Sequence, residues 1–175
     1  MRNFIIGMLF LVMTLSACNT VAAISPTPTV ITLPTSTPKP DCSADTTPDF
    51  TSYATWTKVN PKPIKGHEVY VDIFVNDAAK DTYLSASGMT FPVCSMIVKT
   101  HLQSADLGLI TAITVMVKMP AGYDPETNDW WWGMYDKDGK AAEMSGKVPV
   151  CIACHKPAAA ADYVFSQKVM EESTK

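Results

Sequence analysis

The sequence predicts an α+β fold: a mainly antiparallel β sheet with a few packed helices. Residues 69–75 alternate branched apolar side chains with other types, which is the two-residue period of a half-buried strand. Three further runs are rich in β-branched and aromatic residues and predict strands over 96–102, 109–119 and 130–135. The turn-rich residues 120–125 separate the last two runs, as expected for neighbouring antiparallel strands.

Helices are predicted in only two places. The first covers residues 77–87, with Asn76 or Asp77 as the N-cap. The second covers residues 157–170, an alanine-rich run with Pro157 near its start, where proline is tolerated. The predicted architecture is therefore a sheet with few helices packed on it.

Composition narrows the classes of function. The chain has 175 residues, of which 47% are hydrophobic and 18% charged, and a formal net charge of -3. This balance excludes a nucleic-acid-binding protein that relies on bulk positive charge, and it also excludes a disordered acidic tail. After the N-terminal block no segment reaches the roughly 18 apolar residues that a membrane-spanning helix needs.

The N-terminus indicates export and lipid anchoring. Residues 1–17 combine a short positive region with an apolar core, as in a signal peptide. The residues Leu-Ser-Ala before Cys18 resemble the lipobox of bacterial lipoproteins, which implies cleavage before Cys18 and lipidation of its thiol. The alternative is an uncleaved signal anchor with an incidental cysteine. A lipid anchor predicts a protein on the outer face of the cytoplasmic membrane or on the outer membrane, at the periplasmic or extracellular side.

Residues 18–48 are predicted to be a linker. They are rich in proline and threonine, so they cannot bury a core and favour extended polyproline II segments. The folded domain is then predicted over residues 49–175, which is long enough for a core of its own.

The strongest chemical signal is Cys151-Ile152-Ala153-Cys154-His155, the C-x-x-C-H pattern of c-type haem attachment. Two thiols three residues apart on a turn can each form a thioether with a haem vinyl group. The adjacent His155 imidazole is then the axial iron ligand. The alternatives are a thioredoxin-like dithiol, half of a zinc site, or a plain disulfide.

The position of this motif near the C-terminus bears on the sixth iron position. Among the methionines only Met170 follows the motif, and the upstream methionines show no distinguishing spacing and are typical gap-filling core residues. The sequence therefore predicts an open distal position, which favours small-ligand chemistry over pure electron transfer.

The stretch 151–165 is similar to the haem segment of the cytochrome P-460 family, which includes the cytochromes c′-beta. Residues 115–125 with Asp129-Trp130 resemble the family's sheet and loop before the motif, and the resemblance covers roughly residues 56–165. It implies a mainly antiparallel sheet with packed helices, one covalent haem c, and often a homodimer.

The resemblance also implies a role for Lys99. In the hydroxylamine-oxidising members a strand lysine is cross-linked to the haem rim, in a pattern like F-x-D-G-T-x-x-V-K-E. Here Val98 and Lys99 match that pattern, but the Asp-Gly pair and the following Glu are absent. Because Lys99 shares a strand face with Ile97 and His101, it is expected to point towards the haem. The alternative is a solvated strand lysine.

His67 is a tentative distal group, because its position resembles that of a distal-pocket arginine in hydroxylamine-oxidising relatives. The alternative is an exposed residue at the start of a strand. Glu68 and Asp72 lie in the opposite strand phase and are weaker candidates.

Cys42 and Cys94 are expected to form a disulfide in an oxidising compartment, the alternative being a buried free thiol at Cys94.

Three functions remain at this point. The first is an enzyme of the cytochrome P-460 type that oxidises hydroxylamine to nitrogen oxides and passes electrons to another cytochrome. The second is a cytochrome c′-beta-like protein that binds NO without turnover. The third is a plain electron-transfer cytochrome c. No nucleic acid is expected as a partner.

Overall fold

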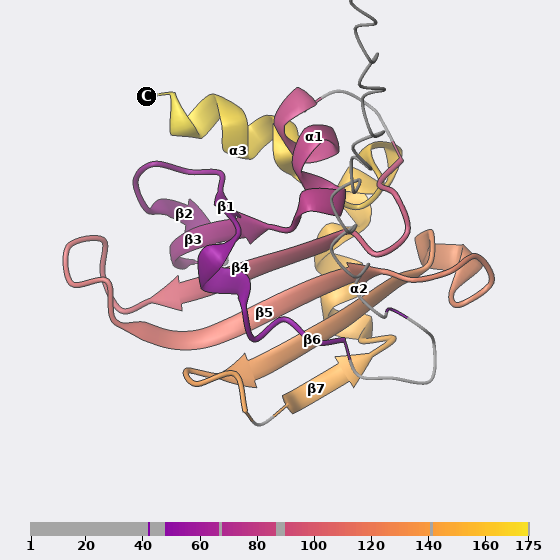
Figure 1. The fold of residues 1–175 in the computed structure, drawn as a ribbon, viewed down its shortest axis with the longest axis horizontal. Coiled ribbons are helices and arrows are strands. Elements are labelled where there is room, and N and C mark those ends of the chain that lie inside the picture. Colours follow the sequence, from indigo (N-terminus) through magenta and orange to yellow (C-terminus); the bar gives the residue numbers. More distant parts are fainter. Residues whose placement is uncertain (1–41, 43–47, 67, 87–89, 141, 175) are drawn as a thin grey trace, which may run out of the picture. The chain divides into compact units, whose positions relative to one another are not determined.

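A computed structural model describes residues 42, 48–66, 68–86, 90–140 and 142–174 (Figure 1). The chain divides into two compact units, 1–37 and 38–175, and every described residue belongs to the second unit. No helix of the described ranges is long and apolar enough to cross a membrane. The predicted signal peptide and Cys18 lie outside the described residues, so export and lipidation stay predictions.

One antiparallel sheet of seven strands organises the domain, and the fold class predicted from the sequence is confirmed. The strand order is β1-β3-β4-β5-β6-β7, and β2 pairs with β3 beside β1. The strands are β1 (Thr57–Lys58), β2 (Ile64–Gly66), β3 (Val69–Val75), β4 (Met96–Leu102), β5 (Ile110–Lys118), β6 (Trp130–Asp136) and β7 (Ala142–Gly146). The alternation over 69–75 and the three runs rich in β-branched and aromatic residues thus predicted β3, β4, β5 and β6 within one residue at each end.

Among the described residues, three α-helices and three short 3-10 helices accompany the sheet. They are α1 (Asp77–Ser85), α2 (Pro149–His155), α3 (Ser166–Ser173), η1 (Tyr53–Thr55), η2 (Pro125–Thr127) and η3 (Lys156–Ala161). The Asn76 side chain caps α1 by accepting a hydrogen bond from the Ala79 amide at 3.1 Å.

The single helix predicted over residues 157–170 is wrong. The chain forms η3 and then turns, because Asp162 and Tyr163 adopt left-handed backbone conformations with φ of 54° and 62°. The helix α3 begins only at Ser166. Tertiary contacts of these two turn residues, described below, outweigh the helix propensity of the alanines.

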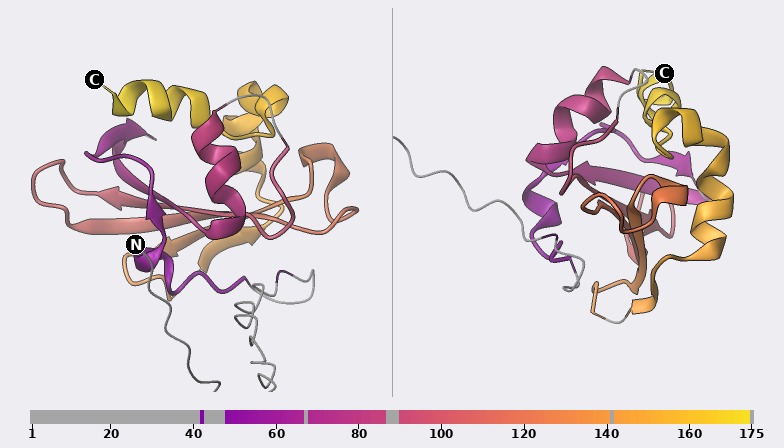
Figure 2. Two further views of the ribbon diagram at one scale, coloured as in Figure 1. Left: turned by 45° about the horizontal axis from the view of Figure 1, so that its top comes forward. Right: turned by 90° about the vertical axis from the view of Figure 1, so that its right-hand side faces the viewer.

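The sheet separates two hydrophobic cores. Figure 2 shows α1 in magenta and α3 in yellow on one side of the sheet, and the indigo segment that follows residue 48 on the other. The helix-side core includes Val71, Ile73, Val75, Ile97, Met116, Trp130 and Trp132 from the strands and Ala79, Tyr83, Tyr163 and Val169 from the helical segments. The opposite core includes Phe50, Met96, Val98, Val115, Val117, Trp131 and Tyr135. Strands β4, β5 and β6 therefore bury side chains on both of their faces.

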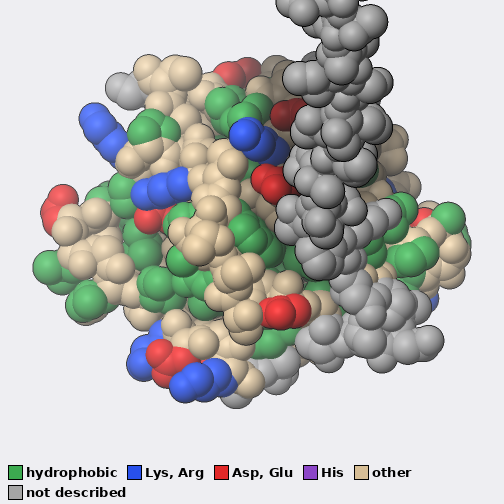
Figure 3. Space-filling model, viewed as in Figure 1, with side chains coloured by type: hydrophobic (Ala, Val, Ile, Leu, Met, Phe, Trp, Pro, Cys, Tyr) green, Lys and Arg blue, Asp and Glu red, His purple; other side chains and the backbone are tan. Residues whose placement is uncertain are grey.

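Some apolar side chains stay at the surface. The hairpin between β4 and β5, at the left of Figure 1, carries Leu107 and Leu109, which are 64% and 55% exposed. Hydrophobic side chains are visible at the surface in the same region of Figure 3.

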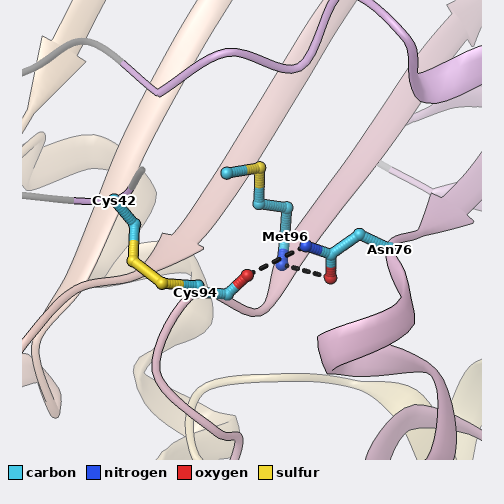
Figure 4. Close-up of a disulfide and its surroundings, with 4 residues drawn as sticks. All are labelled: Cys42, Asn76, Cys94 and Met96. Atoms are coloured by element: carbon cyan, nitrogen blue, oxygen red, sulfur yellow. Dashed lines mark hydrogen bonds between the residues drawn. A yellow bond between two sulfur atoms is a disulfide. The ribbon is translucent and has the colours of Figure 1, made fainter. Parts of the chain in front are cut away.

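A disulfide joins Cys42 to Cys94, with the two Cα atoms 5.5 Å apart (Figure 4). The Cys94 carbonyl accepts a hydrogen bond from Asn76 Nδ2 at 2.9 Å, and Asn76 Oδ1 accepts one from the Met96 amide at 2.9 Å. The disulfide therefore ties Cys42 to the start of β4, where Asn76 also fixes the start of α1.

Candidate functional site

The helix-side face of the sheet presents side chains in parallel rows. Strand pairing gives one row of Ile97, Met116 and Trp132, a second of Lys99, Thr114 and Met134, and a third of His101 and Ala112. Because alternate residues of a strand share a face, neighbouring rows lie about 7 Å apart along the strands. The first row is apolar, whereas the second and third rows contain the polar side chains Lys99, Thr114 and His101.

A cavity of about 500 Å³ lies between these rows and α2. The helix contributes Val150, Cys151, Cys154 and His155 to its wall. Met144 of β7 and Glu68, in the turn before β3, complete its rim. Its size falls within the range of roughly 300–1,000 Å³ typical of small-molecule and cofactor sites.

The two cysteines of the motif lie on α2 and not on a turn. Pro149 occupies the first turn of this helix, where its missing N–H costs nothing. Cys151 and Cys154 are three residues apart and so share one side of the helix, towards the cavity. Both are free thiols, and burial raises the pKa of the partly buried Cys151. Two unpaired sulfur atoms are thus available at one wall of the cavity.

His155 ends α2 and is buried, with 4% of its surface exposed. Its Nδ1 lies 2.8 Å from the Tyr163 carbonyl oxygen. Since a carbonyl only accepts, Nδ1 carries the proton, and the neutral form of a ring held in this way has its lone pair on Nε2. Metal-bound histidines are commonly held in this way. Trp132 packs edge-on against the ring at 4.9 Å between centroids, and Phe165 lies at 5.4 Å.

The turn that supplies the Tyr163 carbonyl is anchored by a buried ion pair. Lys118 Nζ donates to both carboxylate oxygens of Asp162, at 2.7 and 2.8 Å, and both side chains are buried. The Asp162 carboxylate also accepts from the Phe91 amide at 2.8 Å and from Asn128 Nδ2 at 3.0 Å. Trp130 Nε1 donates to the Asp162 carbonyl at 2.8 Å. This network fixes the turn behind His155.

Lys99 lies in the middle of the sheet wall. It contributes to the main cavity and to a second cavity of about 220 Å³, and Cys154 contributes to both as well. Burial lowers the pKa of the Lys99 ammonium to about 8, although the nearby Cys154 and Cys151 sulfurs favour its charged form. Lys99 is therefore a partly buried amine with a substantial neutral fraction near pH 8, beside the C-x-x-C-H helix.

The far end of the cavity is polar. His101 is partly buried, and a hydrogen bond of 3.3 Å joins its Nε2 to Thr114 Oγ1. Burial, and to a lesser degree the Lys99 charge, lower the pKa of His101, which favours the neutral ring. Glu68, treated as a weaker candidate from its strand phase, lies at the same cavity. It has a positive φ of 63° outside β3, so the alternation of the strand does not extend to it.

Other predicted residues lie elsewhere. His67 is outside the described residues, so its distal role stays a prediction. Asp72 does not reach the cavity and forms a 2.8 Å ion pair with Lys58. Met170 is not among the cavity residues either, whereas Met116, Met134 and Met144 are. Tyr163 and Phe165 were not selected from the sequence motif. They contact His155 only because the chain turns after η3 and brings them back to its ring.

The residues present fit a covalently attached haem. Two free thiols and an oriented imidazole converge on one wall of a cavity of suitable size, and most of the other lining residues are apolar. The alternatives fit less well. The sheet is antiparallel, without the βαβ unit of a thioredoxin-like protein, and Cys151 and Cys154 are not bonded to each other. Within the described ranges, no group of three or more His, Cys, Asp or Glu side chains is arranged to hold a metal ion.

The fold and site define a class: β-sheet proteins that carry a C-x-x-C-H haem motif on a helix packed against one face. The chain belongs to the cytochrome P460 family, whose family model matches residues 50–166. It is therefore a cytochrome that binds haem c. No curated protein matches the chain.

Proposed function

We propose that this protein is a membrane-tethered mono-haem enzyme that oxidises hydroxylamine to nitrogen oxides. The observation that carries the proposal is the location of Lys99, on the cavity wall one row from the Trp132 row and beside the C-x-x-C-H helix. Among the family's members, the hydroxylamine-oxidising ones are those with a strand lysine bonded to the haem.

The chain's own residues have distinct parts in holding the group. Cys151 and Cys154 would form the two thioethers, and His155 would bind iron through Nε2 while the Tyr163 carbonyl holds Nδ1–H. When bound, the haem supplies an iron that takes electrons from hydroxylamine and passes them onward. Trp132 and Phe165 exclude water from the His155 side.

Lys99 supplies the additional bond. Its Nζ replaces one N–H by a bond to a carbon of the haem rim, and two protons and two electrons leave with a two-electron oxidant such as a peroxide. Only the neutral amine has the lone pair for this bond, and the burial that lowers the Lys99 pKa to about 8 favours that form.

The remaining parts of the proposal concern location and partners. Lipidation of Cys18 holds the protein at the outer face of a membrane, and residues 19–48 act as the stalk. A soluble cytochrome accepts the electrons, and a homodimer is the proposed assembly. The disulfide between Cys42 and Cys94 supports the export part, because such bonds persist in oxidising compartments.

A second candidate function is NO binding without turnover, as in cytochrome c′-beta. The surroundings of Lys99 favour it, because Val93-Cys94 and Thr100 stand where the oxidising pattern has Asp-Gly and Glu. A plain electron carrier would need an axial methionine or a second histidine, and Met116, Met134, Met144 and His101 line the cavity.

The test is steady-state oxidation of hydroxylamine by the holoprotein with an oxidised cytochrome c as acceptor. Lys99→Met removes the amine, and Lys62→Met changes an exposed loop lysine as the matched control. We expect turnover in the wild type and in Lys62→Met, and its loss in Lys99→Met. NO binding by a wild-type protein that shows no turnover would instead establish the cytochrome c′-beta-like function.

A further inference from the structure

A histidine that the motifs did not select lies at the polar end of the cavity. His101 is two residues beyond Lys99 on β4, so the two side chains share the helix-side face. Thr114, on the adjacent strand β5, holds the His101 ring through the 3.3 Å hydrogen bond at Nε2. The imidazole is thus oriented by its neighbour and directed to the same space as the haem motif.

The rows of the sheet place His101 away from the contact that His155 makes. His155 packs on Trp132, which is in the row of Ile97. His101 is four residues further along β4 than Ile97, which corresponds to about 13 Å of strand. Lys99 lies between these two rows. A haem held by Cys151, Cys154 and His155 would occupy the cavity that His101 also lines.

The surrounding groups suit proton transfer. The titratable groups that share the cavity with His101 are Lys99 on β4, Glu68 before β3, and Cys151, Cys154 and His155 on α2. In the holoprotein the two cysteines are consumed as thioethers. The lowered pKa of His101 leaves its ring mainly neutral at pH 7, so that it has a nitrogen lone pair that can take up a proton. Glu68 is exposed at the rim and offers a route from the ring to solvent.

We propose that His101, oriented by Thr114, is the distal hydrogen-bonding and proton-accepting group for a substrate that would bind in the cavity shared with His155. The inference rests on the proposed function and adds a residue to it. Each N–H or O–H bond that breaks during oxidation of hydroxylamine releases a proton, which His101 takes up and passes towards Glu68. The electrons leave separately, through the haem to the acceptor cytochrome.

Carbon monoxide bound to the reduced holoprotein tests the location of His101 without turnover. The C–O stretching frequency responds to a hydrogen-bond donor beside the bound ligand. We expect His101→Leu to raise this frequency, and His101→Gln, which keeps a donor, to restore part of the shift. Gln103→Leu, an exposed change just beyond β4, should leave it unchanged. An identical frequency in wild type and His101→Leu would overturn the proposal.

Two further measurements separate this inference from the proposed function. Loss of a general base typically costs about 100-fold or more in rate, so His101→Leu should lose that much hydroxylamine turnover and retain the Lys99 cross-link. If the wild type shows no turnover but its C–O frequency depends on His101, the enzyme function fails and the distal location stands. If ferric wild type is low-spin and His101→Leu is high-spin, His101 is an iron ligand and the proposal is wrong.

Discussion

The Nδ1–H of His155 donates to the carbonyl oxygen of Tyr163 at 2.8 Å, across a turn of eight residues. This bond determines which imidazole nitrogen carries the lone pair for iron. The conformation of this turn depends on Asp162, the residue before Tyr163. The Asp162 carboxylate is held by Lys118, which is the last residue of β5. The axial ligand is thus positioned by an ion pair that does not line the cavity.

Removing the cation of this pair should destabilise the fold and disturb the axial ligand. Lys118→Met leaves the buried Asp162 carboxylate without its cation, at a cost of about 3–5 kcal/mol in the free energy of unfolding. We expect the iron–histidine stretching frequency to change as well, because the Tyr163 carbonyl shifts. Urea unfolding and resonance Raman spectroscopy measure the two effects.

The matched control for this prediction is Lys137→Met, which removes the cation of an exposed ion pair with Asp138. It should change neither stability nor spectrum measurably. The combined change Lys118→Met and Asp162→Asn should recover part of the lost stability. Equal effects of Lys118→Met and Lys137→Met would contradict the role of the buried pair.

The Cys42–Cys94 disulfide should contribute substantially to stability. It closes a loop with a sequence separation of 52 residues, which corresponds to about 4 kcal/mol in the chain-entropy model. The variant with both Cys42→Ser and Cys94→Ser should lose this amount in urea unfolding. Reductant should destabilise the wild type and leave the double variant unchanged. If the urea midpoint of the wild type does not change with reductant, the disulfide does not make this contribution to stability.

Gly133 on β6 should not tolerate a side chain. A Cβ atom there would lie 2.6 and 2.7 Å from two ring carbons of Trp131 and 2.8 Å from one of Tyr135. Gly133→Ala therefore overpacks the core opposite the cavity and should cost about 1–3 kcal/mol. Ser145→Ala, at the paired position of β7, is the control and should change stability by less than about 0.5 kcal/mol. A Gly133→Ala protein as stable as the control would contradict the packing.

Formation of the Lys99 cross-link should depend on pH. Because burial lowers the Lys99 pKa to about 8, the neutral fraction of the amine rises as the pH passes through this value. Holoprotein matured with peroxide for a fixed time should thus contain more cross-linked haem at pH 8.5 than at pH 6.5. The absorbance of the cross-linked form, checked by intact mass, measures the fraction. A yield that falls with pH would contradict the neutral amine as the bonding form.

Much of the sheet was predictable because its strands are long and their side chains alternate. Three strands were not predicted: β1, β2 and β7. The first two have only two and three residues, with prolines between them, and β7 has five. The helix α2 was missed because its seven residues include two cysteines and a histidine, which carry no helix signal of their own. Its ends depend on packing against the sheet.

The candidate site divides in the same way. Cys151, Cys154 and His155 were selected from a local motif and Lys99 from the family resemblance, and the structure brings all four to one cavity. His101 was noted only as sharing the Lys99 face, because its partner Thr114 is on another strand. Glu68 was predicted to be a weaker candidate because the strand alternation was extended back to it. Its positive φ interrupts that alternation, and its side chain lines the cavity.

The most direct test of the account is peptide mapping of the reduced holoprotein by mass spectrometry. Trypsin cleaves after Lys147 and Lys168 but does not cleave the Lys156–Pro157 bond. Residues 148–168 should therefore stay together as the haem peptide. The account predicts that Lys99 is bonded to the haem and is therefore not cleaved by trypsin. Residues 81–118 should then remain one peptide, attached through the haem to residues 148–168. The protein giving this peptide should also oxidise hydroxylamine. Cleavage after Lys99, with a haem peptide of residues 148–168 alone, would contradict the cross-link and leave the NO-binding function.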